Sequence, residues 1–136
     1  MNERSSRSHT ILVLQYKQVN KDNSWKSAKL NLVDLAGSEK IAKTGATGML
    51  LQQAKKINLS LTQLGLVIQK LSDGDDHIPF RNSKLTHLLS ESLGGNSKTT
   101  LICTCRQSPL YLEESIQSLK FAQRVKKIKN KATTNV

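Results

Sequence analysis

The segment Leu30–Glu39 constrains the fold of this chain more than any other stretch. Its short apolar run predicts a buried strand over Leu30–Leu35, and the small residues that follow predict a turn. Asp34 therefore lies near the carboxyl end of a strand, where open α/β sheets bind ligands. An aspartate there can hold a metal-bound water, and Gly37 lets a backbone N–H approach a phosphate oxygen. A strand that simply ends in a turn is the alternative.

A second segment near the start of the chain favours the ligand site over a simple strand end. Residues 2–9 have the sequence NERSSRSH. With residues 34–39, DLAGSE, it resembles the two nucleotide-sensing switches of the kinesin motor domain, N-x-x-S-S-R-S-H and D-L-A-G-S-E. Myosins have related switches without the Ser8-His9 ending or the form of residues 36–39. Further segments resemble kinesins: residues 57–58, 60–61, 79–89, 93–100 and 121–124.

The resemblance implies an α/β fold, the C-terminal half of a kinesin-type P-loop NTPase motor. We expect a mixed central sheet, with about three strands in this chain, flanked by about three helices. Residues 1–129 would form the motor half, from the first switch to the last helix. Residues 130–136 would begin the neck linker, which docks along the motor.

The resemblance also assigns roles around ATP and Mg²⁺. Ser6 would ligate the Mg²⁺ ion directly, since this ion keeps several waters and takes few protein oxygens. Ser5 would help to place the attacking water. Asp34 would hold the Mg²⁺ through water, and the Gly37 N–H would sense the γ-phosphate.

Arg7 and Glu39 match the ion pair that joins the two switches in kinesins and so belong to the catalytic set. The alternative is an exposed salt bridge worth under about 1 kcal/mol. Both residues lie inside specific motifs, which favours the switch interpretation.

Periodicity predicts the remaining elements along the chain. Strands are expected over Ser8–Gln18 and Lys98–Arg106, and a loop over Lys40–Gln52. An apolar stripe predicts a helix from Ala54 to Leu71, which packs in the core rather than forming a coiled coil. A shorter helix would start near Phe80 with Asn82 as its N-cap and stop at Gly94-Gly95. A last helix is expected from about Leu112 to Ile128.

Basic side chains would meet the acidic tubulin surface; a solvated basic face is the alternative. These candidates are Lys40, Lys43, Lys55, Lys56, Arg81 and Lys84. The chain departs from the kinesin pattern at Gln53, Lys56, Leu59 and His87, which puts motility in question more than fold. For neck-linker docking, Ile128 would fill a pocket, Asn130 would follow it, and Asn135 would latch the backbone.

A phosphate loop is not found in the sequence. Residues 94–99, GGNSKT, lack the Gly-Lys-Ser/Thr order that the Walker A motif requires, and they predict a helix stop and a turn instead. Phosphoryl transfer depends on positioning and charge stabilisation. We therefore expect this chain alone neither to bind ATP tightly nor to hydrolyse it.

The formal net charge of +11 indicates an acidic partner. Microtubules fit the motifs, and nucleic acid is not expected because no aromatic rings interleave with the basic runs. A basic nucleic-acid-binding domain and a microtubule-binding module without ATP hydrolysis remain as alternatives. No apolar run approaches the roughly 20 residues of a membrane span. The expected location is the cytoplasm, on the microtubule cytoskeleton, and dimerisation would depend on segments outside this chain.

Overall fold

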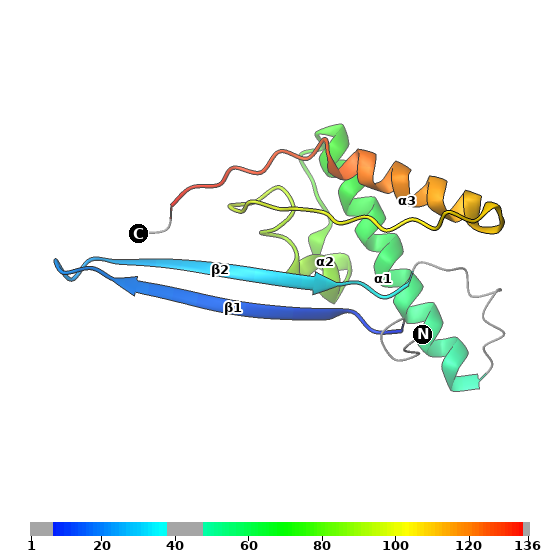
Figure 1. Ribbon diagram of the computed structural model, residues 1–136, viewed down its shortest axis with the longest axis horizontal. Helices are drawn as coiled ribbons and strands as arrows, with labels where there is room; N and C mark the ends of the chain where they lie inside the picture. Colours follow the sequence, from blue (N-terminus) through cyan, green and yellow to red (C-terminus); the bar gives the residue numbers. More distant parts are fainter. Residues whose placement is uncertain (1–6, 38–47, 135–136) are drawn as a thin grey trace. The chain divides into compact units, whose positions relative to one another are not determined.

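A computed structural model of the chain describes residues 7–37 and 48–134. The chain divides into two compact parts, residues 1–38 with 133–136, and residues 39–132. The first part holds an antiparallel hairpin of β1 (Thr10–Val19) and β2 (Trp25–Asp34). The second holds the helices α1 (Gly48–Asp73), α2 (Lys84–Leu88) and α3 (Leu112–Val125) (Figure 1).

The hairpin runs in unbroken register from the Thr10–Asp34 pair to the Val19–Trp25 pair. Its connection is closed by the Asn20 N–H, which donates to the Ser24 carbonyl at 2.8 Å. Asn23 occupies the left-handed region, with a φ of 63°, which asparagine tolerates better than most residues. The predicted strand over Ser8–Gln18 is therefore confirmed. The strand predicted over Leu30–Leu35 is also present, but it begins at Trp25 and ends at Asp34.

One face of the hairpin is apolar in its middle, because the register places like residues opposite each other. Leu12 pairs with Leu32, and Leu14 pairs with Leu30. These four side chains remain 49–54% exposed within the structure, so the expectation of a buried strand is wrong here. The physical reason is that a two-stranded ribbon has too little surface of its own to cover its faces.

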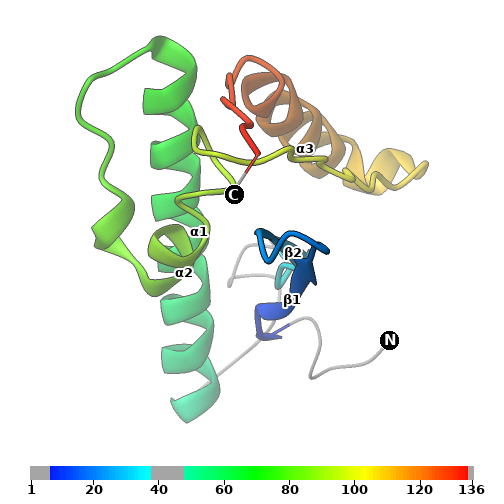
Figure 2. The same ribbon diagram turned by 90° about the vertical axis from the view of Figure 1, so that its left-hand side faces the viewer.

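The core of the second part lies where α1 packs against α2 and the turns that follow it. Figure 2 shows α2 beside the middle of the long α1 helix. Its buried apolar side chains come from both segments: Leu64, Val67, Ile68, Leu85, Leu89 and Leu93. The predicted stripe on α1 is thus confirmed as a core-packed face.

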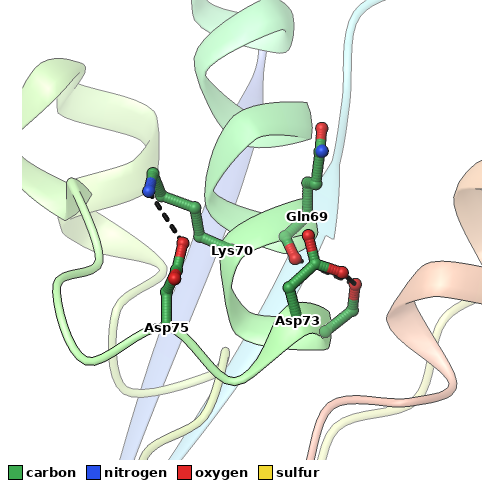
Figure 3. A network of polar contacts seen from close by, with 5 residues as sticks. Gln69, Lys70, Asp73 and Asp75 are labelled. Carbon is green, nitrogen blue, oxygen red and sulfur yellow. Dashed lines mark hydrogen bonds and ion pairs between the residues drawn. The ribbon is translucent and has the colours of Figure 1, made fainter.

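The α1 helix begins at Gly48 rather than Ala54, so the predicted loop over Lys40–Gln52 is wrong for its last residues. Residues 49–53, MLLQQ, are all strong helix formers, and the helix extends through them. At the other end, Lys70 Nζ and Asp75 Oδ2 form an ion pair at 2.8 Å across the terminus (Figure 3). Gly74, with a φ of +77°, then takes the left-handed conformation that ends the helix.

Ser83, rather than the predicted Asn82, caps α2. Its side chain accepts the Thr86 N–H at 3.1 Å. Asn82 ends a 3₁₀ turn, Phe80–Asn82, and its side-chain nitrogen donates to the Gln63 Oε1 of α1 at 3.1 Å. The regular helix has five residues, and helical turns continue to the Gly94-Gly95 stop that the sequence predicted.

Residues 98–106 are extended but form no strand, so the described part has two strands rather than about three. An extended segment becomes a strand only when a neighbour pairs with its backbone, and no described segment does so. The predicted helix near Leu112 is confirmed as α3, although its apolar face, which includes Ile116 and Leu119, is not buried. Among the described helices, none is long and apolar enough to cross a membrane.

Candidate functional site

The two switch-like segments meet at the open end of the hairpin. The Ala36 N–H donates a hydrogen bond to His9 Nδ1 at 3.0 Å. The Thr10–Asp34 pair ends the ladder directly beside this contact. Pairing therefore holds the end of the first segment, residues 7–9, against the turn that follows Asp34.

The residues at this end of the hairpin differ in their exposure to solvent. Asp34 is exposed, Gly37 and Arg7 are half-buried, and Ala36 is buried. Burial lowers the pKa of His9 below its ordinary value of 6.5, because desolvation disfavours the charged ring. The neutral ring can accept the Ala36 N–H, whereas the protonated ring cannot.

Asp34 and Gly37 are the predicted nucleotide-site residues that the structure describes together. An exposed carboxylate at a strand end fits a Mg²⁺ ion held through water, since this ion takes few direct protein ligands. No group of three or more metal-binding side chains occurs in residues 7–37 and 48–134. The described residues therefore fit one side of a Mg²⁺–phosphate site.

Several of the predicted site residues lie outside the described residues, and their roles stay predictions. These residues are Ser5, Ser6, Glu39, Lys40, Lys43 and Asn135. Because Glu39 is one of them, the Arg7–Glu39 ion pair also stays a prediction.

Arg81 and Lys84 lie together on an open hollow of about 290 Å³, which Ser83 and His87 also line. We call this the basic hollow. Its two cationic side chains are exposed, and the N-cap hydrogen bond of Ser83 fixes the backbone between them. The arrangement suits an acidic protein surface, because two exposed positive charges flank a concave patch.

Lys55 and Lys56 are exposed on the amino-terminal half of α1. They lie on the same helix as the core residues Leu64 and Ile68. The packing of that core fixes the helix and thereby the positions of both lysine backbones.

Asn130 connects the segment after α3 to the turn after α2. Its Oδ1 accepts the Gly94 N–H at 2.7 Å, and its Nδ2 donates to the Ser92 carbonyl at 3.0 Å. Ile128 and Asn130 line a hollow of about 390 Å³, which we call the linker hollow. The structure thus brings these two predicted docking residues together.

Sequence reasoning did not single out three residues that the structure places at these sites. His9 was noted only as the end of a motif, Ser83 was overlooked as a cap, and His87 was noted only as a departure. The hydrogen-bond partner of His9 could not be predicted from local sequence, because the Ala36 amide is 27 positions away.

Comparisons with known proteins support one family. The sequence profile of the kinesin motor domain matches residues 1–128. The chain is 57% identical over 136 residues to Kinesin-related protein 5 of Dictyostelium discoideum, covering 99% of this chain and 14% of that protein. It is also 57% identical to the kinesin heavy chain of Botryotinia fuckeliana, covering 99% of this chain and 16% of that protein.

Solved structures agree with the sequence matches. A fast kinesin matches with a TM-score of 0.86 and 55% identity, covering 98% of this chain and 38% of that chain. A KIF14 dimer with AMP-PNP in complex with a microtubule matches with a TM-score of 0.87 and 38% identity, covering 96% of this chain and 38% of that one. The chain therefore spans well under half of the relatives it matches. With both switch motifs and the matched fold in hand, we conclude that this chain belongs to the kinesin motor domain family.

Proposed function

We propose that this chain supplies the nucleotide-sensing switches and the microtubule-binding face of an ATP-driven kinesin motor. The observation that carries the proposal is the junction of residues 7–9 with the turn after Asp34, held by the His9–Ala36 hydrogen bond. In the motor, Ser6 and Asp34 would hold Mg²⁺, and Ser5 and Gly37 would act on the attacking water and the γ-phosphate. Arg7 and Glu39 would close the switches when ATP is bound.

The microtubule face would comprise the basic hollow and the lysines of α1. Arg81 and Lys84 are exposed around one concave patch, which favours an acidic protein partner. The matched KIF14 structure is in complex with a microtubule, which supports this choice of partner. Lys55, Lys56, Lys40 and Lys43 would add to the same attraction, and the protein would act on the cytoplasmic microtubule cytoskeleton.

The last residues would form the start of a neck linker. Residues 1–129 would then be motor and residues 130–136 linker, with Ile128 in the linker hollow and Asn130 at the boundary. The four polar contacts of the Asn130 side chain support a docked arrangement of this segment. Asn135 would complete the docking as a backbone latch.

Catalysis would require more than this chain. Of the residues proposed to hold Mg²⁺, the structure describes Asp34 alone, and the sequence contains no Walker A motif to cradle phosphates. ATP would supply the reacting phosphate and Mg²⁺ the charge neutralisation when bound. We therefore expect the isolated chain to be inactive and an intact parent motor to be a microtubule-stimulated ATPase.

Co-sedimentation with microtubules tests the binding proposal. We expect the chain to pellet with microtubules in a salt-sensitive way, because the attraction is between exposed charges. The Arg81→Ala/Lys84→Ala double variant should bind more weakly. The matched control is Lys21→Ala/Lys26→Ala, which removes two exposed hairpin charges. Equal loss of binding in both double variants would contradict a specific role for the basic hollow.

Nucleotide binding is tested separately with a fluorescent ATP analogue. The expected result is no tight binding by the isolated chain, with or without Mg²⁺. Micromolar, Mg²⁺-dependent binding would overturn the expectation that the chain alone is inactive. Binding to DNA with a steep salt dependence, coupled with no pelleting on microtubules, would instead favour a nucleic-acid-binding domain.

A further inference from the structure

His9 lies where the two switch-like segments approach each other, and none of the roles considered so far uses its side chain. Its Nδ1 accepts the Ala36 N–H at 3.0 Å, across 27 residues of sequence. Ala36 is only 5% exposed. A buried backbone N–H needs a partner, because leaving it unpaired loses its hydrogen bond to water without replacement.

This hydrogen bond extends the pairing of the two segments beyond the hairpin ladder. The ladder ends at the Thr10–Asp34 pair, so the strands alone do not fix the residues that follow. The His9 contact holds Ala36, which lies between Asp34 and Gly37. It therefore sets the position of the turn that carries both of these predicted nucleotide-site residues.

We propose that His9 is a positioning residue that clasps the Asp34–Gly37 turn to the Arg7–His9 segment through its neutral imidazole. What the two segments do with nucleotide rests on the proposed function, whereas the clasp itself does not. The clasp requires an unprotonated Nδ1, since a protonated ring has only donors to offer.

The surroundings of His9 favour this neutral state. Burial lowers the pKa of His9, so the ring is uncharged at neutral pH. Among the described residues of the two segments, the charged groups are Arg7, two residues before His9, and Asp34, opposite Thr10 in the ladder. Desolvation, rather than either charge, is the cause of the lowered pKa.

The sign of the pH dependence follows from the lowered pKa. Above the ordinary value of 6.5 the ring is neutral in both open and closed states, and the clasp keeps its full strength. As pH falls below 6.5 toward the lower folded-state pKa, the open state binds the proton before the closed state does. The clasp should therefore open in mild acid.

Amide hydrogen exchange of the full chain, read by NMR at Ala36, tests the proposal. Two variants that both lack the imidazole ring test whether an acceptor at the position of Nδ1 is what protects the Ala36 amide. His9→Asn places a side-chain oxygen near the position of Nδ1 and does not titrate. His9→Gln places its amide near the position of Nε2, too far along the side chain to serve the same N–H.

We expect the wild-type Ala36 amide to be protected at pH 7.5. Its protection factor should begin to fall as the pH drops below about 6.5, by up to about tenfold per pH unit, and should level off below the folded-state pKa of His9. His9→Asn should keep protection at both pH 7.5 and pH 5.5, and His9→Gln should lack it at both. Amides in the middle of the hairpin should be unchanged, because the clasp lies beyond the ladder.

Two results would overturn the clasp: equal Ala36 protection in wild type and His9→Gln, or wild-type protection that does not change with pH. If His9→Gln unfolds the hairpin, the wild-type pH series and His9→Asn still decide the matter. Failure of the proposed function would be visible elsewhere, as loss of microtubule pelleting with the Ala36 result intact.

Discussion

Replacing Asn130 with alanine should release the segment after α3 from the turn that follows α2. The side chain makes four contacts: its Oδ1 accepts from Gly94, and its Nδ2 donates to the Ser92 carbonyl, Ser97 Oγ and Thr99 Oγ1 at 2.9–3.1 Å. An amide nitrogen has only two protons, so three donated contacts count as two full hydrogen bonds at most.

The magnitude follows from that count. A neutral hydrogen bond contributes a net of about 0.5–1.5 kcal/mol. Three such bonds at a partly exposed site, taken at the lower part of that range, give a loss of about 2 kcal/mol in the local free energy of opening. Since 1.4 kcal/mol is about tenfold in an equilibrium constant, the open population should rise by roughly 30-fold.

The neighbouring Lys131 amide reports this opening, because it donates to the Gly95 carbonyl at 3.1 Å. Its hydrogen-exchange protection should fall by roughly 30-fold in Asn130→Ala. Asn130→Asp keeps the acceptor for the Gly94 N–H, so the protection of the Lys131 amide should fall by less in this variant. Lys129→Ala is the control, because it changes an exposed neighbour. Unchanged protection of Lys131 in Asn130→Ala would refute the reasoning that Asn130 anchors this segment.

Three further substitutions test the turn and the cap by urea-induced unfolding. Gly95→Ala should cost about 1–3 kcal/mol, because an added Cβ would lie 2.6 Å from the Glu91 carbonyl oxygen; no loss would mean that the backbone relaxes freely. Thr86→Val removes a fully buried hydroxyl that donates to the Phe80 carbonyl at 2.6 Å and should cost about 1–3 kcal/mol, whereas Thr86→Ser, which keeps the hydroxyl, should cost less. Ser83→Ala should cost about 1 kcal/mol, and a loss equal to that of Asn82→Ala would contradict the assignment of the cap to Ser83.

The sequence predicted the elements whose signals are local. Alternation identified the first strand of the hairpin, and a short apolar run identified the second half of the other strand. The stripe through Leu64 and Ile68 identified α1 and its buried face. The start of α1 was missed because the glycines at positions 45 and 48 indicated a loop over Lys40–Gln52, although residues 49–53 have high helix propensity. Asn82 was predicted as the cap because asparagine is a good N-cap. The neighbouring serine is an equally good one, and only the backbone geometry shows that Ser83 is the cap.

The remaining differences arise from partners distant in sequence. Residues 98–106 have a strand-like composition, yet pairing decides whether a strand forms, and no described segment pairs with them. The His9–Ala36 contact likewise depends on the register of the hairpin, which brings together residues 27 positions apart. Motif matching named the segments that form the candidate site, and register determined which of their atoms meet.

The most direct test of the central claim is a chimaeric motor. Residues 1–128 would replace the matching segment in the motor domain of the Dictyostelium Kinesin-related protein 5, to which the chain is 57% identical, and ATP hydrolysis would be measured with and without microtubules. We predict microtubule-stimulated hydrolysis by the chimaera, which Arg7→Ala should abolish, and none by the isolated chain. A folded chimaera that binds ATP and microtubules but shows no stimulation would contradict the claim that this chain couples nucleotide sensing to microtubule binding.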